Sequence, residues 1–269
     1  MESDASTALQ QLSDRLFLEW PWIGLGAALV LALLLFATNK LRSTERVGRW
    51  YDPVWLAWLA VPVYLLHIFE EYGAHVTDGQ FDLVLMFQKM GIDEMFGGLP
   101  LFFFPCINIT AMWVFAPIAA LCARKNPAVG LSFYGFMAVN ALTHIGSTAV
   151  LGGDILANPG NVTGIFLFVP LAIWVYHVCV RGSFMDGRGL AACILGGVLG
   201  HMLLFSIYIV NLMLGHLAAA LWVPFAVSSP IWVSWLLCKA FRSKTPKLMT
   251  GWLHEELPAD ATKTAGARK

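Results

Sequence analysis

The chain has 269 residues, of which 58% are hydrophobic and 13% are charged, and its formal net charge is zero. Soluble domains carry about 25% charged residues, so this composition excludes an ordinary soluble domain. The lack of net positive charge also speaks against a nucleic-acid partner. Apolar runs of about 18 residues or more recur, and each is long enough to cross a bilayer core. We therefore expect an all-α, polytopic transmembrane helical bundle.

The apolar runs predict about seven membrane-spanning helices. In chain order they cover residues 18–38, 54–73, 99–123, 128–150, 162–180, 190–213 and 216–238. The last two runs are joined tightly, so six spans is the alternative count. The chain then divides into a short outer segment, one membrane domain and a basic, mobile cytosolic tail, at 1–17, 18–240 and 241–269.

The Lys and Arg residues predict which end of the bundle faces the cytosol. The chain has 17 such residues. Apart from Arg15 and Lys89, they lie in the loops after spans one, three and five, or at and beyond the end of span seven. Because cytoplasmic loops are enriched in Lys and Arg, we expect the N-terminus outside and the C-terminus in the cytosol. A six-span bundle would place the basic tail on the opposite side, so the charges favour seven spans.

Three apolar runs carry polar residues in their outer halves. Spans two, four and six contain, respectively, His67, Glu70 and Glu71; Asn140 and His144; and His201 and Tyr208. All three spans are predicted to run outward, so the helical rise places the three histidines at about 17 to 24 Å from the cytosolic edge. Residues three or four positions apart share a helix face, and we expect these faces to meet in one polar layer.

The composition of this layer matches a first-row metal site. Histidine and carboxylate side chains bind catalytic zinc and non-haem iron. We predict that a divalent metal, zinc or iron, is bound by His67, Glu71, His144 and His201. A metal-free acid site is the alternative among functional readings.

The remaining polar residues are candidates for catalysis. The glutamate that does not bind metal, Glu70 or Glu71, would act as a general acid or base. Asn140 would orient a ligand or an oxyanion, and Tyr208 completes the candidate set. The structural alternative is interhelical hydrogen bonding, which a single buried polar residue would favour. Six such residues at one depth, with adjacent carboxylates, favour a functional site.

At these residues the chain resembles the HXXEE-motif family of integral membrane proteins. The motif stands as "HIFEE" at 67–71, while "NALTH" at 140–144 and "NPGNVTG" at 158–164 are similar to the later Asn-x3-His segment and Pro-Gly turn of that family. The resemblance covers about residues 54–180 and does not include His201. It implies a polytopic membrane protein, and the family has no established general activity.

We expect a membrane-embedded, metal-dependent enzyme that hydrolyses, isomerises or cyclises a lipophilic substrate entering from the bilayer. Its partners would be membrane lipids and that substrate, and the oligomeric state is open. One alternative is a proton- or metal-coupled transporter that uses the same residues as a relay. Another is a non-haem iron oxidoreductase, although the multi-histidine clusters of membrane desaturases are absent. A retinal-binding receptor is disfavoured because residues 216–238 contain no lysine.

Overall fold

The computed structural model describes residues 2–74, 76–77, 80–92, 95, 100–182 and 184–244, with the backbone alone at 2–17, 76–77 and 80. The predicted outer segment at 1–17 is helical from residue 2 onward and continues into the first span without a break. Residues 245–269 of the predicted tail lie outside the described residues.

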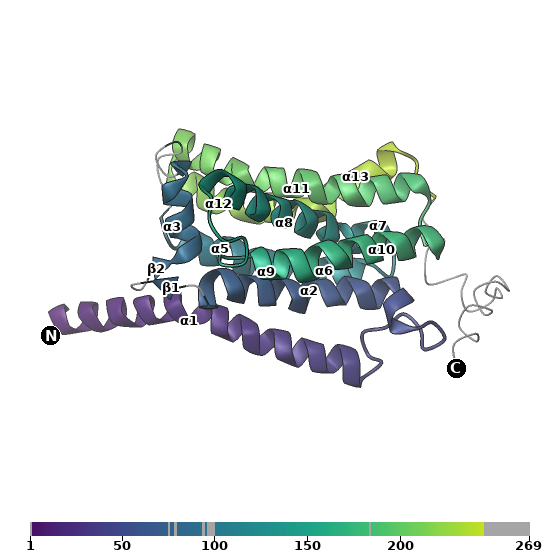
Figure 1. Cartoon of the computed structure of the whole chain (residues 1–269), viewed down its shortest axis with the longest axis horizontal. Coiled ribbons are helices and arrows are strands. Elements are labelled where there is room, and N and C mark those ends of the chain that lie inside the picture. Colours follow the sequence, from purple (N-terminus) through teal and green to yellow (C-terminus); the bar gives the residue numbers. More distant parts are fainter. Residues whose placement is uncertain are drawn as a thin grey trace.

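Helices make up about four fifths of the described chain, which confirms the all-α prediction (Figure 1). The α-helices are α1 (Glu2–Ala37), α2 (Pro53–Phe69), α3 (Asp82–Lys89), α5 (Phe103–Ile109), α6 (Ala116–Cys122), α7 (Pro127–Gly130), α8 (Ser132–Leu151), α9 (Asn161–Thr163), α10 (Val169–Arg181), α11 (Gly187–Leu214), α12 (His216–Val227) and α13 (Ser229–Ala240). Strands β1 (Val76–Thr77) and β2 (Gln80–Phe81) form a small antiparallel hairpin.

A 3-10 turn and three π-helical segments complete the helices: η1 (Arg49–Tyr51), η2 (Glu70–Ala74), η3 (Thr110–Phe115) and η4 (Gly164–Phe168). Segment η2 continues α2, η3 joins α5 to α6, and η4 joins α9 to α10. Short π-helical segments inside α-helices are rare and occur often at functional sites. Both glutamates of the motif begin η2.

Six helices of the described chain are long and apolar enough to cross a membrane. They are Leu18–Ala37, Pro53–Ala74, Phe103–Cys122, Pro127–Leu151, Asn161–Arg181 and Gly187–Leu214. These agree with the first six predicted spans to within a few residues. Helices α12 and α13 pass the same test only as a pair, and they are bent by 50° at the break between them.

The bent pair runs along the whole of α11. At one end, Nδ1 of His216 lies 2.6 Å from Oδ1 of Asn211 in the last turn of α11. At the other end, the backbone nitrogen of Lys244 donates to Asp186, the N-cap of α11, at 2.8 Å. The pair therefore covers both ends of α11, which supports a seventh crossing. The membrane orientation of these ends stays a prediction.

Helix α2 lies at the centre of the bundle, between α1 and the layer that holds α6, α9 and α10 (Figure 1). Its start is fixed by Asp52, whose Oδ1 accepts from the backbone nitrogens of Val54 and Trp55 at 2.9 and 3.3 Å. The Tyr134 hydroxyl of α8 donates to the carbonyl of Leu56 at 2.7 Å. Buried aromatic hydroxyls need such partners, so this bond fixes α8 against α2.

Candidate metal site

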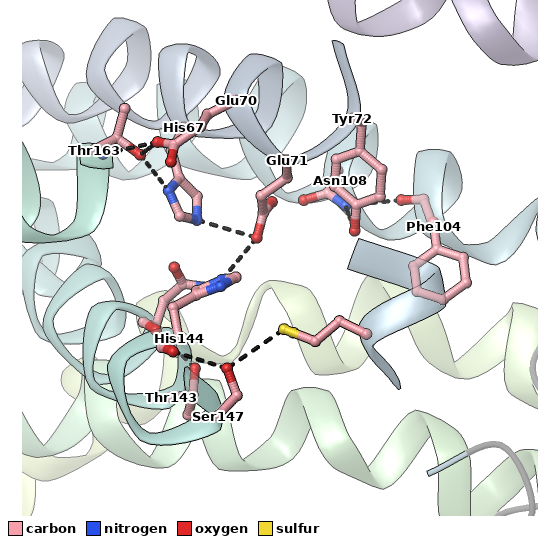
Figure 2. Close-up of polar contacts among 12 residues, drawn as sticks. His67, Glu70, Glu71, Tyr72, Phe104, Asn108, Thr143, His144, Ser147 and Thr163 are labelled. Atoms are coloured by element: carbon pink, nitrogen blue, oxygen red, sulfur yellow. Dashed lines mark hydrogen bonds and ion pairs between the residues drawn. The ribbon is translucent and has the colours of Figure 1, made fainter. Parts of the chain in front are cut away.

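Three side chains from α2, η2 and α8 converge on one point. Each of His67, Glu71 and His144 offers a ligand atom, and these atoms lie within 4.8 Å of one another. The Nε2 atoms of His67 and His144 lie 3.2 and 2.8 Å from the same carboxylate oxygen of Glu71 (Figure 2). The three residues are 0%, 5% and 4% exposed, in the order His67, His144, Glu71. The cluster is therefore shielded from solvent on all sides.

The two adjacent glutamates point to different neighbours. Consecutive helical residues are rotated by about 100°, so Glu70 and Glu71 cannot serve the same point. Glu71 is four residues after His67 and shares its face, which turns it toward α8. Glu70 points toward the start of the fifth span (Figure 2).

Glu70 holds the first residues of the fifth span. Its Oε1 accepts from the backbone nitrogen of Val162 at 2.9 Å, and its Oε2 accepts from that of Thr163 at 2.7 Å. The Thr163 hydroxyl also donates to Oε2, at 2.5 Å. A carboxylate is stabilised at the N-terminus of a helix by these free N–H groups and by the helix dipole. The carboxylate of Glu70 therefore accepts three hydrogen bonds from the start of this span. Its acid–base role stays a prediction.

The Thr163 hydroxyl also determines which nitrogen of His67 carries a proton. Nδ1 of His67 lies 2.7 Å from Oγ1 of Thr163. A hydroxyl has one proton to donate, and the charged carboxylate of Glu70 is the stronger acceptor for it. Oγ1 therefore accepts from the Nδ1–H of His67. Nδ1 is thus engaged by Thr163, and Nε2 is the ring nitrogen that faces Glu71, at 3.2 Å.

A glycine turn covers the two imidazoles. Gly160 has a φ of 83°, which favours glycine over residues with a Cβ atom. A Cβ atom there would lie 2.8 Å from Nδ1 of His144 and 2.9 Å from Cε1 of His67. The turn is anchored by Thr148, which accepts from the side-chain amide of Asn161 at 2.7 Å and donates to the His144 carbonyl at 3.1 Å.

Residues 58–175 match the family model described as "Protein of unknown function with HXXEE motif". This segment, which is less than half of the chain, is similar to the HXXEE-motif family. No curated protein and no solved structure matches the chain. The HXXEE segment contains the whole cluster, and it also contains Thr163 and Gly160. The resemblance seen in the sequence is confirmed.

Two predicted site residues, His201 and Tyr208, lie on α11 beyond the HXXEE segment. His201 is buried and does not belong to the three-residue ligand group. Its ring contacts those of Phe136 and Phe205, at centroid distances of 4.9 and 5.5 Å. Tyr208 is buried and interacts electrostatically with Tyr72, the residue after Glu71. Metal ligation by His201 and catalysis by Tyr208 stay predictions.

Asn140 lies on α8 one turn before His144, as the sequence predicted. It is 9% exposed, and its Oδ1 atom has no hydrogen-bond partner among the described residues. Buried side-chain oxygens are nearly always hydrogen-bonded, so this atom is available to a ligand. Its role as an orienting group stays a prediction.

The sequence did not single out Thr163 or Gly160. Both fall in the stretch "NPGNVTG", which the resemblance named only as a Pro-Gly turn. The sequence shows only that polar residues precede an apolar run at this point. It does not show which distant residues they contact. The partner of Thr163 is 96 residues away in the chain.

Proposed function

We propose that the chain is a multi-pass membrane protein in which His67, Glu71 and His144 bind one divalent metal ion. Two imidazoles and one carboxylate form the ligand set of many catalytic zinc sites and of non-haem iron enzymes. Three ligands leave coordination positions open for a substrate or water. The residues therefore fit a catalytic metal better than a closed structural site.

The observation that carries this proposal is the convergence of two imidazoles on one carboxylate. The Nε2 atoms of His67 and His144 lie 3.2 and 2.8 Å from the same Glu71 oxygen, and Nδ1 of His67 is held by the Thr163 hydroxyl. A divalent cation at this point would be bound by all three groups. A histidine that donates its other N–H to a carboxylate or hydroxyl is also the common arrangement around a bound metal. The chain from Glu70 through Thr163 to His67 has that form.

We propose that the bound ion serves acid–base chemistry on a lipophilic substrate. A divalent ion would supply Lewis acidity, polarising a substrate oxygen or activating water. The chain's part is to hold the ligands and exclude bulk water. The rings of Tyr64 and Phe168 pack on His67 at centroid distances of 5.5 and 4.4 Å. A substrate reaches such a site from within the bundle or from the surrounding hydrocarbon, so it must be apolar.

The same ligand set supports a second candidate, an iron-dependent oxidoreductase. Two histidines and one carboxylate are the protein ligands of non-haem Fe(II) oxygenases. The identity of the bound metal decides between the two, because zinc has no redox chemistry.

Metal analysis of the purified full-length chain tests the proposal. We expect about one zinc or iron ion per chain after gentle extraction, and less than about a tenth of that in His67→Ala or Glu71→Gln. The control is His177→Ala, which removes an exposed histidine of α10 and should leave the metal content unchanged. A wild-type protein without stoichiometric metal, or variants that retain it, would overturn the metal assignment.

A further inference from the structure

Helices α8 and α11 come into backbone contact just below the cluster. A Cβ atom on Gly135 would lie 2.8 Å from the carbonyl of Ile194, and one on Gly197 would lie 2.5 Å from the backbone nitrogen of Phe136. Small residues permit this kind of close approach between membrane helices. The glycines therefore fix the relative height of the two helices.

Asn140 and His201 lie at one level above this contact. Both helices run from the end of the bundle that holds α7 to the opposite end (Figure 1). Asn140 is five residues after Gly135 and His201 is four residues after Gly197, so the helical rise places them about 7.5 and 6 Å beyond the contact. His201 also interacts electrostatically with Glu71 and both histidines of the cluster. Asn140 is one turn before His144 on the same helix, so both side chains lie in the layer of the proposed metal site.

Each of these two side chains has a buried polar atom without a partner. Within the part of the chain that the structure describes, Oδ1 of Asn140 and Nδ1 of His201 make no hydrogen bond, and the residues are 9% and 3% exposed. A buried polar atom without a hydrogen-bond partner is destabilising. Two of them at one level indicate that a ligand supplies the missing bonds. A hydroxyl group donates one hydrogen bond and also accepts, so it satisfies the amide oxygen together with the Nδ1–H tautomer of His201.

The charges around the site indicate an uncharged ligand. The spans that supply the site contain no Lys or Arg at residues 54–74, 128–151, 161–180 or 190–214. One divalent ion is balanced by the carboxylates of Glu70 and Glu71. An additional anion or cation would remain uncompensated in a layer where charges are costly.

On the basis of the proposed function, we infer that the substrate is an uncharged lipophilic alcohol whose hydroxyl group binds between Asn140 and His201. The hydroxyl donates to Oδ1 of Asn140 and accepts from Nδ1 of His201. The rings of Phe136 and Phe205, which flank His201, contact the apolar part next to the hydroxyl. The reacting carbon or oxygen then lies beside the cluster of His67, Glu71 and His144.

The test is photolabelling of the full-length chain in lipid nanodiscs. Three probes share one diazirine-bearing alkyl chain and end in a hydroxyl, a carboxylate or a quaternary ammonium group. Labelled peptides are mapped by mass spectrometry with and without excess unlabelled long-chain alcohol. We expect competed labelling of α8 and α11 near Asn140 and His201 by the hydroxyl probe, about tenfold above the charged probes, as expected for one buried hydrogen bond.

Variants identify the residues that hold the hydroxyl. Asn140→Leu and His201→Leu should each lower competed labelling about tenfold and leave the metal content unchanged, which also shows that the variants fold. His201→Gln should restore labelling in part, and His177→Leu should have no effect. Equal labelling by the carboxylate probe, or full labelling of both leucine variants, would overturn the inference. Loss of metal in His201→Leu would instead make His201 a ligand, as the sequence predicted, and would also overturn it.

The two proposals fail independently. A metal-free protein that still binds the hydroxyl probe through Asn140 would remove the proposed function and keep the alcohol site. A protein with stoichiometric metal that labels equally with all three probes would do the reverse.

Discussion

The two central spans differ from the peripheral ones in what surrounds them. The most apolar windows of α2 with η2 and of α7 with α8 are 83% and 72% buried, whereas those of the other four single-helix spans are 28–39% buried. The polar cluster lies on the two central spans. The peripheral span of α1 has no ionisable residue from 20 to 37. Polar groups inside a bilayer are tolerated where protein surrounds them. This explains why the polar cluster lies on the two most buried spans.

The largest expected difference is in packing. Leu65 on α2 is 2% exposed, and Leu33 on α1 is 67% exposed. We expect Leu65→Ala to lower the free energy of unfolding by about 2 to 4 kcal/mol, because it leaves a cavity. Leu33→Ala should change it by less than about 0.5 kcal/mol. Unfolding in mixed micelles measures both values, and equal losses would contradict the central-versus-peripheral distinction.

The turn over the cluster gives a second test, with a matched glycine. Gly160 and Gly152 have φ angles of 83° and 73°, but a Cβ atom on Gly152 would meet nothing within 4 Å. Gly152 has the less permissive backbone, with ψ at 171° against −10° for Gly160, so Gly152→Ala carries at least as much backbone strain as Gly160→Ala. We expect Gly160→Ala alone to weaken metal binding, by about 100-fold, because its methyl group displaces the imidazoles. Metal titration of the stripped proteins measures this, and similar affinities in the two variants would contradict it.

Thr163 should have a somewhat smaller effect. Thr163→Val keeps the shape and removes the hydroxyl between Glu70 and His67. We expect metal affinity to fall by about 10-fold or more, the range for a lost hydrogen bond behind a ligand. The control is Thr143→Val on α8, because the Thr143 hydroxyl bonds to a carbonyl of its own helix. Metal affinity that is unchanged in Thr163→Val would contradict a supporting role of the Thr163 hydroxyl behind the ligand His67.

The smallest effect is expected at the far end of the bundle, at Asp186. Partial burial raises its pKa, but donors from Lys244, Ser243 and Gly189 outweigh this and hold the pKa below its ordinary value. A lowered pKa adds stability that is present above the unfolded value of about 3.9 and is lost as the pH falls below it.

We therefore expect the melting temperature of the wild type to fall between pH 5 and pH 3 by slightly more than that of Asp186→Asn, because part of the wild-type loss comes from this carboxylate. Melting curves recorded across about this pH range measure the difference. Identical pH profiles would show that these bonds do not contribute.

Much of the architecture could be predicted because bilayer thickness sets the length of an apolar run. The first six runs became helices at nearly the predicted positions, and the helical rise placed His67 and His144 at one depth. The seventh crossing could not be settled from hydropathy, because the break between α12 and α13 is visible only in the structure. The contacts of His216 and Lys244 with the two ends of α11 support that crossing.

The sequence by itself determined that His67, Glu71 and His144 would be buried together, since their spacing and depth follow from helix geometry. It could not distinguish the contact partners of Glu70 and Glu71, which are adjacent in the chain and equal in chemistry. Only the tertiary structure decided these partners, because the fifth span lies beside one glutamate and α8 beside the other. The partners Thr163 and Gly160 come from distant segments, and side-chain direction relative to a neighbouring helix is not encoded in local periodicity.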